Sequence, residues 1–163
     1  MLAPELLAHL LAKAALLATD PGTTRLNAVD LNPPALRGSE LCGAQLEGAD
    51  LRDSDLRGAD LSRARLRYAN VRLVDLTYAC LAEADLREAD LSYANLSSAD
   101  LSNADLCGAN LTEAILSGAN LSHANLRGAC LRNANLLDAN FAGAHLSEID
   151  VRGAILPDGF RYD

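Results

Sequence analysis

A single five-residue pattern of hydrophobic and polar positions repeats through most of the chain. Of the 27 positions that follow one another in steps of five from Leu26 to Leu156, 24 are leucine. Two residues before these positions, from Ala44 to Ala154, 20 of 23 residues are alanine. No insertion or deletion breaks this register, so the same local structure is expected in every repeat. The exceptions are Val71, Phe141 and Val151 at leucine positions and Ser54, Val74 and Ile149 at alanine positions.

This period fits neither a continuous α-helix nor a flat strand. Five residues advance about 140° around a helix, which would spread the leucines over every side. On a flat strand an odd period sends successive leucines to opposite faces. Within one repeat, however, alanine and leucine lie two residues apart and share one face of an extended segment. Both can point inward in every repeat only if the chain turns a corner once per repeat, which predicts a coil around a narrow apolar interior.

The remaining positions of the repeat favour turns. The position before the leucine is mostly Asp or Asn, whose side chains hydrogen-bond to the local backbone in turns. The position after the leucine is mostly Arg, Ser or Thr, as contact with solvent would allow. Glycine at the second position after the leucine would relieve a turn that needs positive φ or a close backbone approach. Nine of the eleven glycines lie there: Gly38, Gly43, Gly48, Gly58, Gly108, Gly118, Gly128, Gly143 and Gly153.

Residues 1–18 are predicted to form an amphipathic helix, which ends at the breakers of residues 19–22. A secretory signal would need a basic start and an unbroken apolar centre, whereas Glu5, His9 and Lys13 interrupt this segment. We therefore expect a retained lid over the first coil. The early repeats are irregular, as terminal capping units usually are, with Thr24, Val29, Pro34 and Ser39 at alanine positions.

The predicted organisation is an N-terminal cap and connector over residues 1–24, a repeat coil over 25–157 and a C-terminal tail over 158–163. Open β edges at the ends of such a rod promote association. In the tail, Phe160 and Tyr162 are expected to cover part of the last coil.

Composition narrows the class of protein. The chain of 163 residues has two Phe, four Tyr and no Trp, so a small alanine-lined interior replaces an aromatic core. A net charge of −8 argues against direct nucleic-acid binding. No apolar stretch approaches the roughly 18 residues of a membrane span. The four cysteines, Cys42, Cys80, Cys107 and Cys130, have neither zinc-site nor redox-motif spacing, which predicts free thiols and a cytoplasmic location.

The A-(D/N)-L-x-x pattern, as in Ala59-Asp60-Leu61-Ser62-Arg63, resembles the pentapeptide repeat proteins common in bacteria, especially cyanobacteria. The match covers about residues 25–157. The resemblance implies an all-β solenoid, a right-handed quadrilateral parallel β-helix of about seven coils with four pentapeptides per turn. With the N-terminal capping α-helix, this is the expected fold.

Four repeats per turn would stack residues that lie twenty apart. One column would then hold Asp50, Asn70, Asp90 and Asn110, in which Asn separates the carboxylates. Asp85 and Asp105 would stack with no asparagine between them, so the repulsion of their carboxylates is expected to be unrelieved. Arginines would stack as well, as in Arg52 over Arg72 and Arg67 over Arg87, whereas no two cysteines would be stacked neighbours.

Enzymatic chemistry is not expected. His9, His123 and His145 are the only histidines, and the serines belong to the repeat and have no evident partner to orient a base. We therefore assign no catalytic, cofactor-binding or metal-ligating residue and no cofactor. Cation binding by the carboxylate columns is an alternative, although Asn dilutes their charge and no calcium repeat is present.

Two functions remain. The preferred one is a non-enzymatic structural scaffold, a rigid rod that presents a polar outer surface to an unknown protein partner, with a homodimer through one end of the rod as a further option. The alternative comes from the resemblance, since some family members imitate duplex DNA and bind a type II topoisomerase such as DNA gyrase. The net charge agrees with that alternative, but interspersed arginines interrupt the negative surface: Arg52, Arg57, Arg63, Arg65, Arg67, Arg72 and Arg87.

Overall fold

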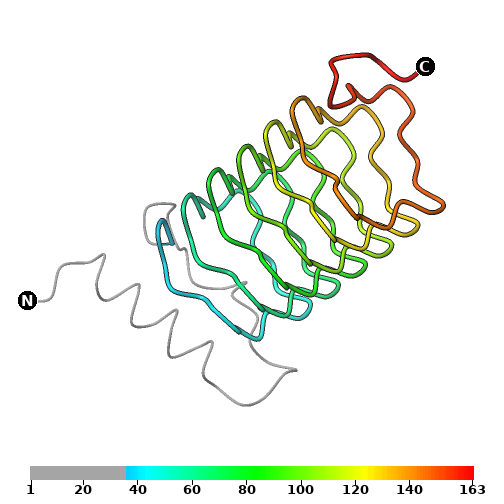
Figure 1. Ribbon diagram of the computed structural model, residues 1–163. Coiled ribbons are helices and arrows are strands. Elements are labelled where there is room, and N and C mark those ends of the chain that lie inside the picture. The colour runs from blue at the N-terminus through cyan, green and yellow to red at the C-terminus, as the bar shows by residue number, and fades with distance from the viewer. Residues whose placement is uncertain (1–35) are drawn as a thin grey trace, which may run out of the picture.

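The computed structural model describes residues 36–163, and the chain there winds into a regular coil (Figure 1). The predicted helix over residues 1–18, its role as a lid and the boundary between residues 24 and 25 lie outside the described residues. Residues 36–163 contain no α-helix and no strand longer than a single bridge residue. Accordingly, no helix in this part of the chain is long and apolar enough to cross a membrane.

The coils are joined by isolated parallel bridges between residues twenty positions apart. The first is Glu40 with Asp60, and they continue at every fifth residue to Asn135 with Ile155. A twenty-residue offset equals four pentapeptides, so the prediction of four repeats per turn is confirmed. Each face takes its name here from its first described leucine, as the Leu36, Leu41, Leu46 and Leu51 faces.

The interior consists of leucine and alanine side chains from all four faces. Leucines of the central coils, such as Leu81 and Leu121, are 0% exposed, and Ala99 is 1% exposed. The inward orientation of both positions is therefore confirmed. Burial of this kind contributes about 1.5–3 kcal/mol per leucine.

Backbone hydrogen bonds join each coil to its neighbours at three of the five positions of a repeat. Leu61 N donates to Cys80 O at 2.7 Å, and Arg63 N donates to Ala82 O at 2.9 Å. In return, Cys80 N donates to Ala59 O at 2.9 Å. The same three bonds recur along the rod, so adjacent coils are held in one register on every face.

The other two N–H groups of a repeat are satisfied inside it. Ala64 N donates to Leu61 O at 3.0 Å and closes a turn. Ser62 N donates to the Asp60 side chain at 2.9 Å, and Asp or Asn repeats this contact in most repeats. The predicted role of Asp and Asn in the turns is confirmed, and all five N–H groups of such a repeat have acceptors.

Every corner of the coil has a residue with positive φ, two positions after the leucine. The nine glycines at this position have φ of 64–73°, which confirms their predicted role. Fifteen other residues adopt φ of 55–62° at the same position, and none of them is β-branched. Positive φ at the third residue only is the signature of a type II turn. Large side chains also occupy these corners, which the sequence analysis did not predict.

The C-terminal tail covers part of the last coil by its backbone. Ile155 bridges Arg161 in an antiparallel sense, and Tyr162 N donates to Ala154 O at 2.8 Å. The rings of Phe160 and Tyr162 stay 72% and 49% exposed, so the predicted cover by these two residues is made through their backbone. Main-chain pairing satisfies the open edge without the need to bury an aromatic side chain.

Candidate functional site

The histidines do not form a catalytic arrangement in the described part of the chain. His123 lies at a corner after Leu121 with φ of 59°, and His145 is exposed on the adjacent Leu46 face. This placement on adjacent faces at outward positions is as predicted, whereas His9 lies outside the described residues. Within residues 36–163 no group of three or more His, Cys, Asp or Glu side chains could hold a metal ion.

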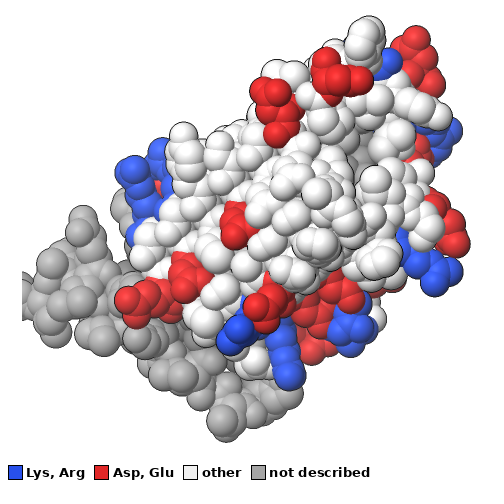
Figure 2. Space-filling view, in the orientation of Figure 1, with Lys and Arg blue, Asp and Glu red and all other residues white. Residues whose placement is uncertain are grey.

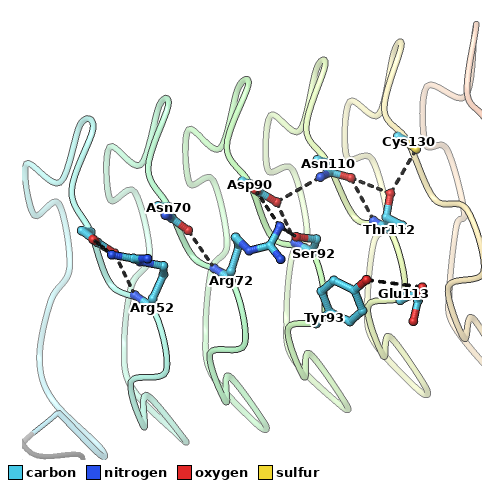
Figure 3. Close-up of polar contacts among 11 residues, drawn as sticks. Arg52, Asn70, Arg72, Asp90, Ser92, Tyr93, Asn110, Thr112, Glu113 and Cys130 are labelled. Atoms are coloured by element: carbon cyan, nitrogen blue, oxygen red, sulfur yellow. Dashed lines mark hydrogen bonds and ion pairs between the residues drawn. The ribbon is translucent and has the colours of Figure 1, made fainter.

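The Leu51 face carries a continuous row of hydrogen-bonded polar side chains across several coils (Figure 3). Bridges stack Asp50, Asn70, Asp90 and Asn110 in the predicted order. Asn110 Nδ2 donates to Asp90 Oδ1 at 3.0 Å. The asparagine therefore does more than separate two charges, since its amide also hydrogen-bonds to the carboxylate below.

The arginines of this face bind carboxylates. Arg52 Nε donates to Asp50 Oδ1 at 2.8 Å, and this hydrogen bond lowers the pKa of the Asp50 carboxyl. Arg72 Nη1 donates to Ser92 Oγ at 2.7 Å and to Asp90 Oδ2 at 3.4 Å. Burial raises the pKa of Asp90, but the hydrogen bonds from Ser92 and Arg72 outweigh it and leave this pKa below its ordinary value.

The expectation that the repulsion between the stacked Asp85 and Asp105 carboxylates is unrelieved is wrong. Arg87 pairs with both carboxylates, and its hydrogen bond to Asp85 lowers the pKa of that carboxyl. Arg57 does the same on the Leu36 face, with distances of 2.5 Å to Asp55 and 3.7 Å to Asp75. An arginine two residues after an aspartate can therefore neutralise that aspartate and the one stacked on it.

Large exposed side chains gather at the corners of the coil that spans residues 61–80. Tyr68, Leu73 and Tyr78 lie at successive corners and are 57%, 54% and 74% exposed. Tyr93, 43% exposed, occupies the corner one coil after Leu73. Sequence reasoning missed this cluster, although Tyr and Leu at the position favoured by glycine were a visible signal.

Two of these tyrosines carry an arginine against the ring. The guanidinium carbon of Arg67 lies 5.2 Å from the Tyr68 ring centroid, and that of Arg72 lies 5.4 Å from the Tyr93 ring centroid. Such contacts hold a flat cation over an aromatic face at the protein surface.

The four thiols are free and lie apart. Cys42 is exposed, and Ser62 Oγ donates to its sulfur at 3.2 Å. Cys130 Sγ lies 3.3 Å from Thr112 Oγ1. The twenty-residue register puts no cysteine directly above another, and these contacts place the thiols among the outward polar side chains.

Charge is distributed unevenly over the outer surface. Figure 2 shows one side of the rod on which acidic and basic groups lie mainly near the margins, with a broad uncharged area between them. Ten ion pairs join arginines to carboxylates among the described residues, including those of Arg63 with Glu83 and Arg132 with Asp150. Much of the acidic surface is thus locally neutralised.

Comparison with known proteins gives matches to repeat proteins of one kind. A family model described as "Pentapeptide repeats" matches in eight copies, over residues 35–67, 54–92, 69–106, 89–128 and 119–156. None of the curated proteins matches the chain.

Three similar solved structures are pentapeptide repeat or quinolone-resistance proteins. HetL from the cyanobacterium Nostoc sp. strain PCC 7120, involved in heterocyst differentiation regulation, is 39% identical over 77% of this chain, with a TM-score of 0.48. The protein alr5209 from the same cyanobacterium is 39% identical over 56% of this chain and 84% of its own, with a TM-score of 0.51. QnrB1, a plasmid-mediated fluoroquinolone resistance protein, is 22% identical over 67% of this chain and 58% of its own, with a TM-score of 0.56.

The present chain spans 63% of the length of HetL. The likeness to QnrB1 concerns the fold alone, a class with known right-handed quadrilateral β-helices. The twenty-residue register, the leucine and alanine interior and the family matches from residue 35 to residue 156 agree with one another. The chain belongs to the pentapeptide repeat family.

Proposed function

We propose that this protein is a non-enzymatic interaction scaffold, a rigid rod that presents a polar outer surface to a protein partner. The observation that carries this proposal is that inward and outward positions of each repeat have separate roles. The leucine and alanine side chains fill the interior, whereas the other three positions of the repeat face outward. Outer side chains can therefore serve recognition without changing the core.

The outer side chains are also held in place, which favours a binding role. Side-chain hydrogen bonds between adjacent coils, such as that from Asn125 Nδ2 to Asp105 Oδ1 at 2.9 Å, hold the outer polar groups in fixed positions. A surface whose side chains are already ordered loses less conformational entropy when a partner binds. The rod is thus suited to present a fixed pattern of hydrogen-bonding groups.

A DNA-mimic regulator of a type II topoisomerase, such as DNA gyrase, is the second candidate. The net charge of −8 and the narrow coil favour it, and the fold is shared with a fluoroquinolone resistance protein. The arginine pairs weigh against it, because they neutralise the carboxylates that would have to imitate phosphates. Asp50, Asp55, Glu83, Asp85, Asp90 and Asp150 are all paired in this way.

Three further assignments belong to this proposal. Residues 1–24 act as the N-terminal cap, and pairing of two rods would use an end of the rod. The four free thiols favour a reducing compartment, the cytoplasm.

Site-directed photo-cross-linking of the full chain in its host cells tests the scaffold. A photoreactive residue is placed in turn at one exposed corner of each face, and the cross-linked proteins are identified. A scaffold predicts one partner protein whose cross-links concentrate on one face. Equal, weak cross-linking of many proteins from every face would contradict it. Inhibition of gyrase supercoiling by the purified chain would instead favour the second candidate.

A further inference from the structure

The coil of residues 61–80 holds bulky side chains where glycine would fit the backbone best. Tyr68 and Leu73 of this coil have φ of 58°, and Tyr93 one coil later has φ of 62°, in the left-handed region that disfavours side chains. Nine other corners of the same rod carry glycine, so the fold itself does not require these residues. Fifteen corners carry a residue other than glycine, so these three are set apart by their large side chains and by their exposure of 43–57%.

Contacts within the protein hold two arginines beside these corners in place before any partner binds. Arg72 is fixed from two sides, since Ser92 Oγ and Asp90 accept its hydrogen bonds and the Tyr93 ring lies 5.4 Å from its guanidinium carbon (Figure 3). Arg67 lies over Tyr68, and its Nη2 donates to the Tyr68 hydroxyl at 3.2 Å. The tyrosine–arginine surface is defined as Arg67, Tyr68, Arg72, Leu73 and Tyr93, on and beside the Leu51 face.

The positive charge at this surface is incompletely neutralised. Within residues 36–163 Arg67 forms no ion pair, and the one ion pair of Arg72 is with Asp90, at 3.4 Å. The Nε of Arg67 is buried and has no acceptor among the described residues. The Arg67 guanidinium therefore stays available to a carboxylate of a partner, beside exposed apolar groups, although Glu113 accepts a hydrogen bond from the Tyr93 hydroxyl at 3.5 Å.

We propose that the tyrosine–arginine surface binds a segment of a partner protein that carries carboxylates on either side of an apolar side chain. The carboxylates would pair with Arg67 and Arg72, whose planar guanidinium groups suit carboxylates. The apolar side chain would pack against Leu73 and the tyrosine rings. Tyrosine and arginine are the residue types that dominate binding energy at protein interfaces. This inference rests on the proposed scaffold function and names the partner chemistry.

A nucleic-acid strand is the less suitable occupant. Its phosphates could also bind arginine, and its bases could stack on tyrosine. A strand, however, carries one charge per nucleotide, so repulsion by the excess of acidic groups over the rest of this rod would act along its whole length. A short acidic segment of a protein meets that repulsion only locally.

The test measures binding of the full-length chain to an array of short synthetic peptides, each with a central Leu or Phe and flanks graded from acidic to basic. Single-stranded oligodeoxythymidine is a parallel probe. The variants are Leu73→Gly, Tyr68→Gly and Arg67→Glu. Because φ is positive at Leu73 and Tyr68, glycine removes their side chains without strain, so lost binding cannot be ascribed to unfolding.

Matched controls exist in the same rod. Arg127→Glu makes the same charge change at the same repeat position of the Leu46 face, beside Gly128 in place of a tyrosine. Asn103→Gly makes a glycine corner on the Leu41 face, at φ of 58°. Thermal melting of each variant checks that the coil is intact.

The expected result is a preference for acidic peptides with an apolar centre, weakened about tenfold or more by Leu73→Gly and by Arg67→Glu but not by the controls. No preference for acidic flanks, equal weakening by Arg127→Glu, or tighter binding of the oligonucleotide than of every peptide would each overturn the proposal. A cellular partner that cross-links equally well to these variants would leave the scaffold function standing and refute only this surface.

Discussion

The Nε of Arg87 lies 3.5 Å from the Oδ2 of Asp105, one coil beyond the Asp85 carboxylate that the same guanidinium binds. One arginine thus bridges two carboxylates that the ladder stacks directly on each other. Without this cation, two like charges would face each other at the spacing of adjacent strands, about 4.8 Å.

Replacement of Arg87 by Gln should lower the urea midpoint of the rod, because it removes two partly exposed ion pairs and leaves Asp85 and Asp105 opposed. Urea denaturation at low ionic strength measures the loss, and about 1 M salt should reduce it by screening the repulsion. Arg127→Gln is the control, since within residues 36–163 the one ion pair of Arg127 is with the exposed Glu148, at 3.4 Å. Equal losses in the two variants would refute the bridging role.

Substitution of Gly58 isolates the cost of the corner conformation. Gly58 has φ of 64°, and a Cβ there would meet no atom within 4 Å. Gly58→Ala should therefore destabilise the coil by about 1–2 kcal/mol through backbone strain alone. Gly58→Val should cost more and Gly58→Asn less, because Asn tolerates the left-handed region and β-branched residues do not. Chemical denaturation that ranked Val as the mildest change would contradict the turn geometry.

The alanine position should tolerate no enlargement. Ala99 is 1% exposed in the interior, so Ala99→Leu should overpack the coil and destabilise it by roughly 1–3 kcal/mol. Ala82 offers a matched control, since it follows a leucine at an outward position and is partly exposed. Ala82→Leu should leave the denaturation midpoint nearly unchanged. An Ala99→Leu variant as stable as the wild type would show that the interior has spare room.

Stability should fall in acid. Hydrogen bonds from Arg57 and Arg87 hold the pKa values of Asp55 and Asp85 below the usual 3.8. The unfolded chain therefore binds more protons than the folded chain below about pH 4, so the stabilisation is complete above that pH and is lost as the pH falls towards the folded-state pKa values.

Urea midpoints measured from about pH 7 down to pH 2 should show this decline. The double variant Arg57→Gln with Arg87→Gln should show a shallower one, because both causes of the lowered pKa values are removed. A wild-type midpoint that stays constant or rises in acid would be inconsistent with these pairs.

The sequence predicted the parts of the fold that depend on local periodicity. Leu61 and Ala59 point inward and Gly58 turns a corner because each position has the same role in every repeat. The stacking of Asp90 under Asn110 followed once four repeats per turn were assumed.

Contacts that depend on side-chain direction were missed. The reach of Arg87 to Asp105 requires a particular rotamer and a neighbouring coil, neither of which is visible in a linear pattern. Tyr78 at φ of 59° was missed because the bonds between coils hold the backbone there against its local preference. The helix over residues 1–18 stays a prediction.

Because stacked positions lie twenty residues apart, the number of residues before a position decides which face of the rod it occupies. An insertion or deletion can therefore move all later residues to another face. Gain of a whole coil would lengthen the rod and keep every column in line. Gain of a single pentapeptide would leave each new leucine and alanine inside, yet turn all later outer residues by a quarter of a revolution. Tyr93 would then leave the corner of Leu73, and the Asn110 amide would lose Asp90. Changes in length by single repeats can thus create a new exterior from unchanged residues, while the core remains the same.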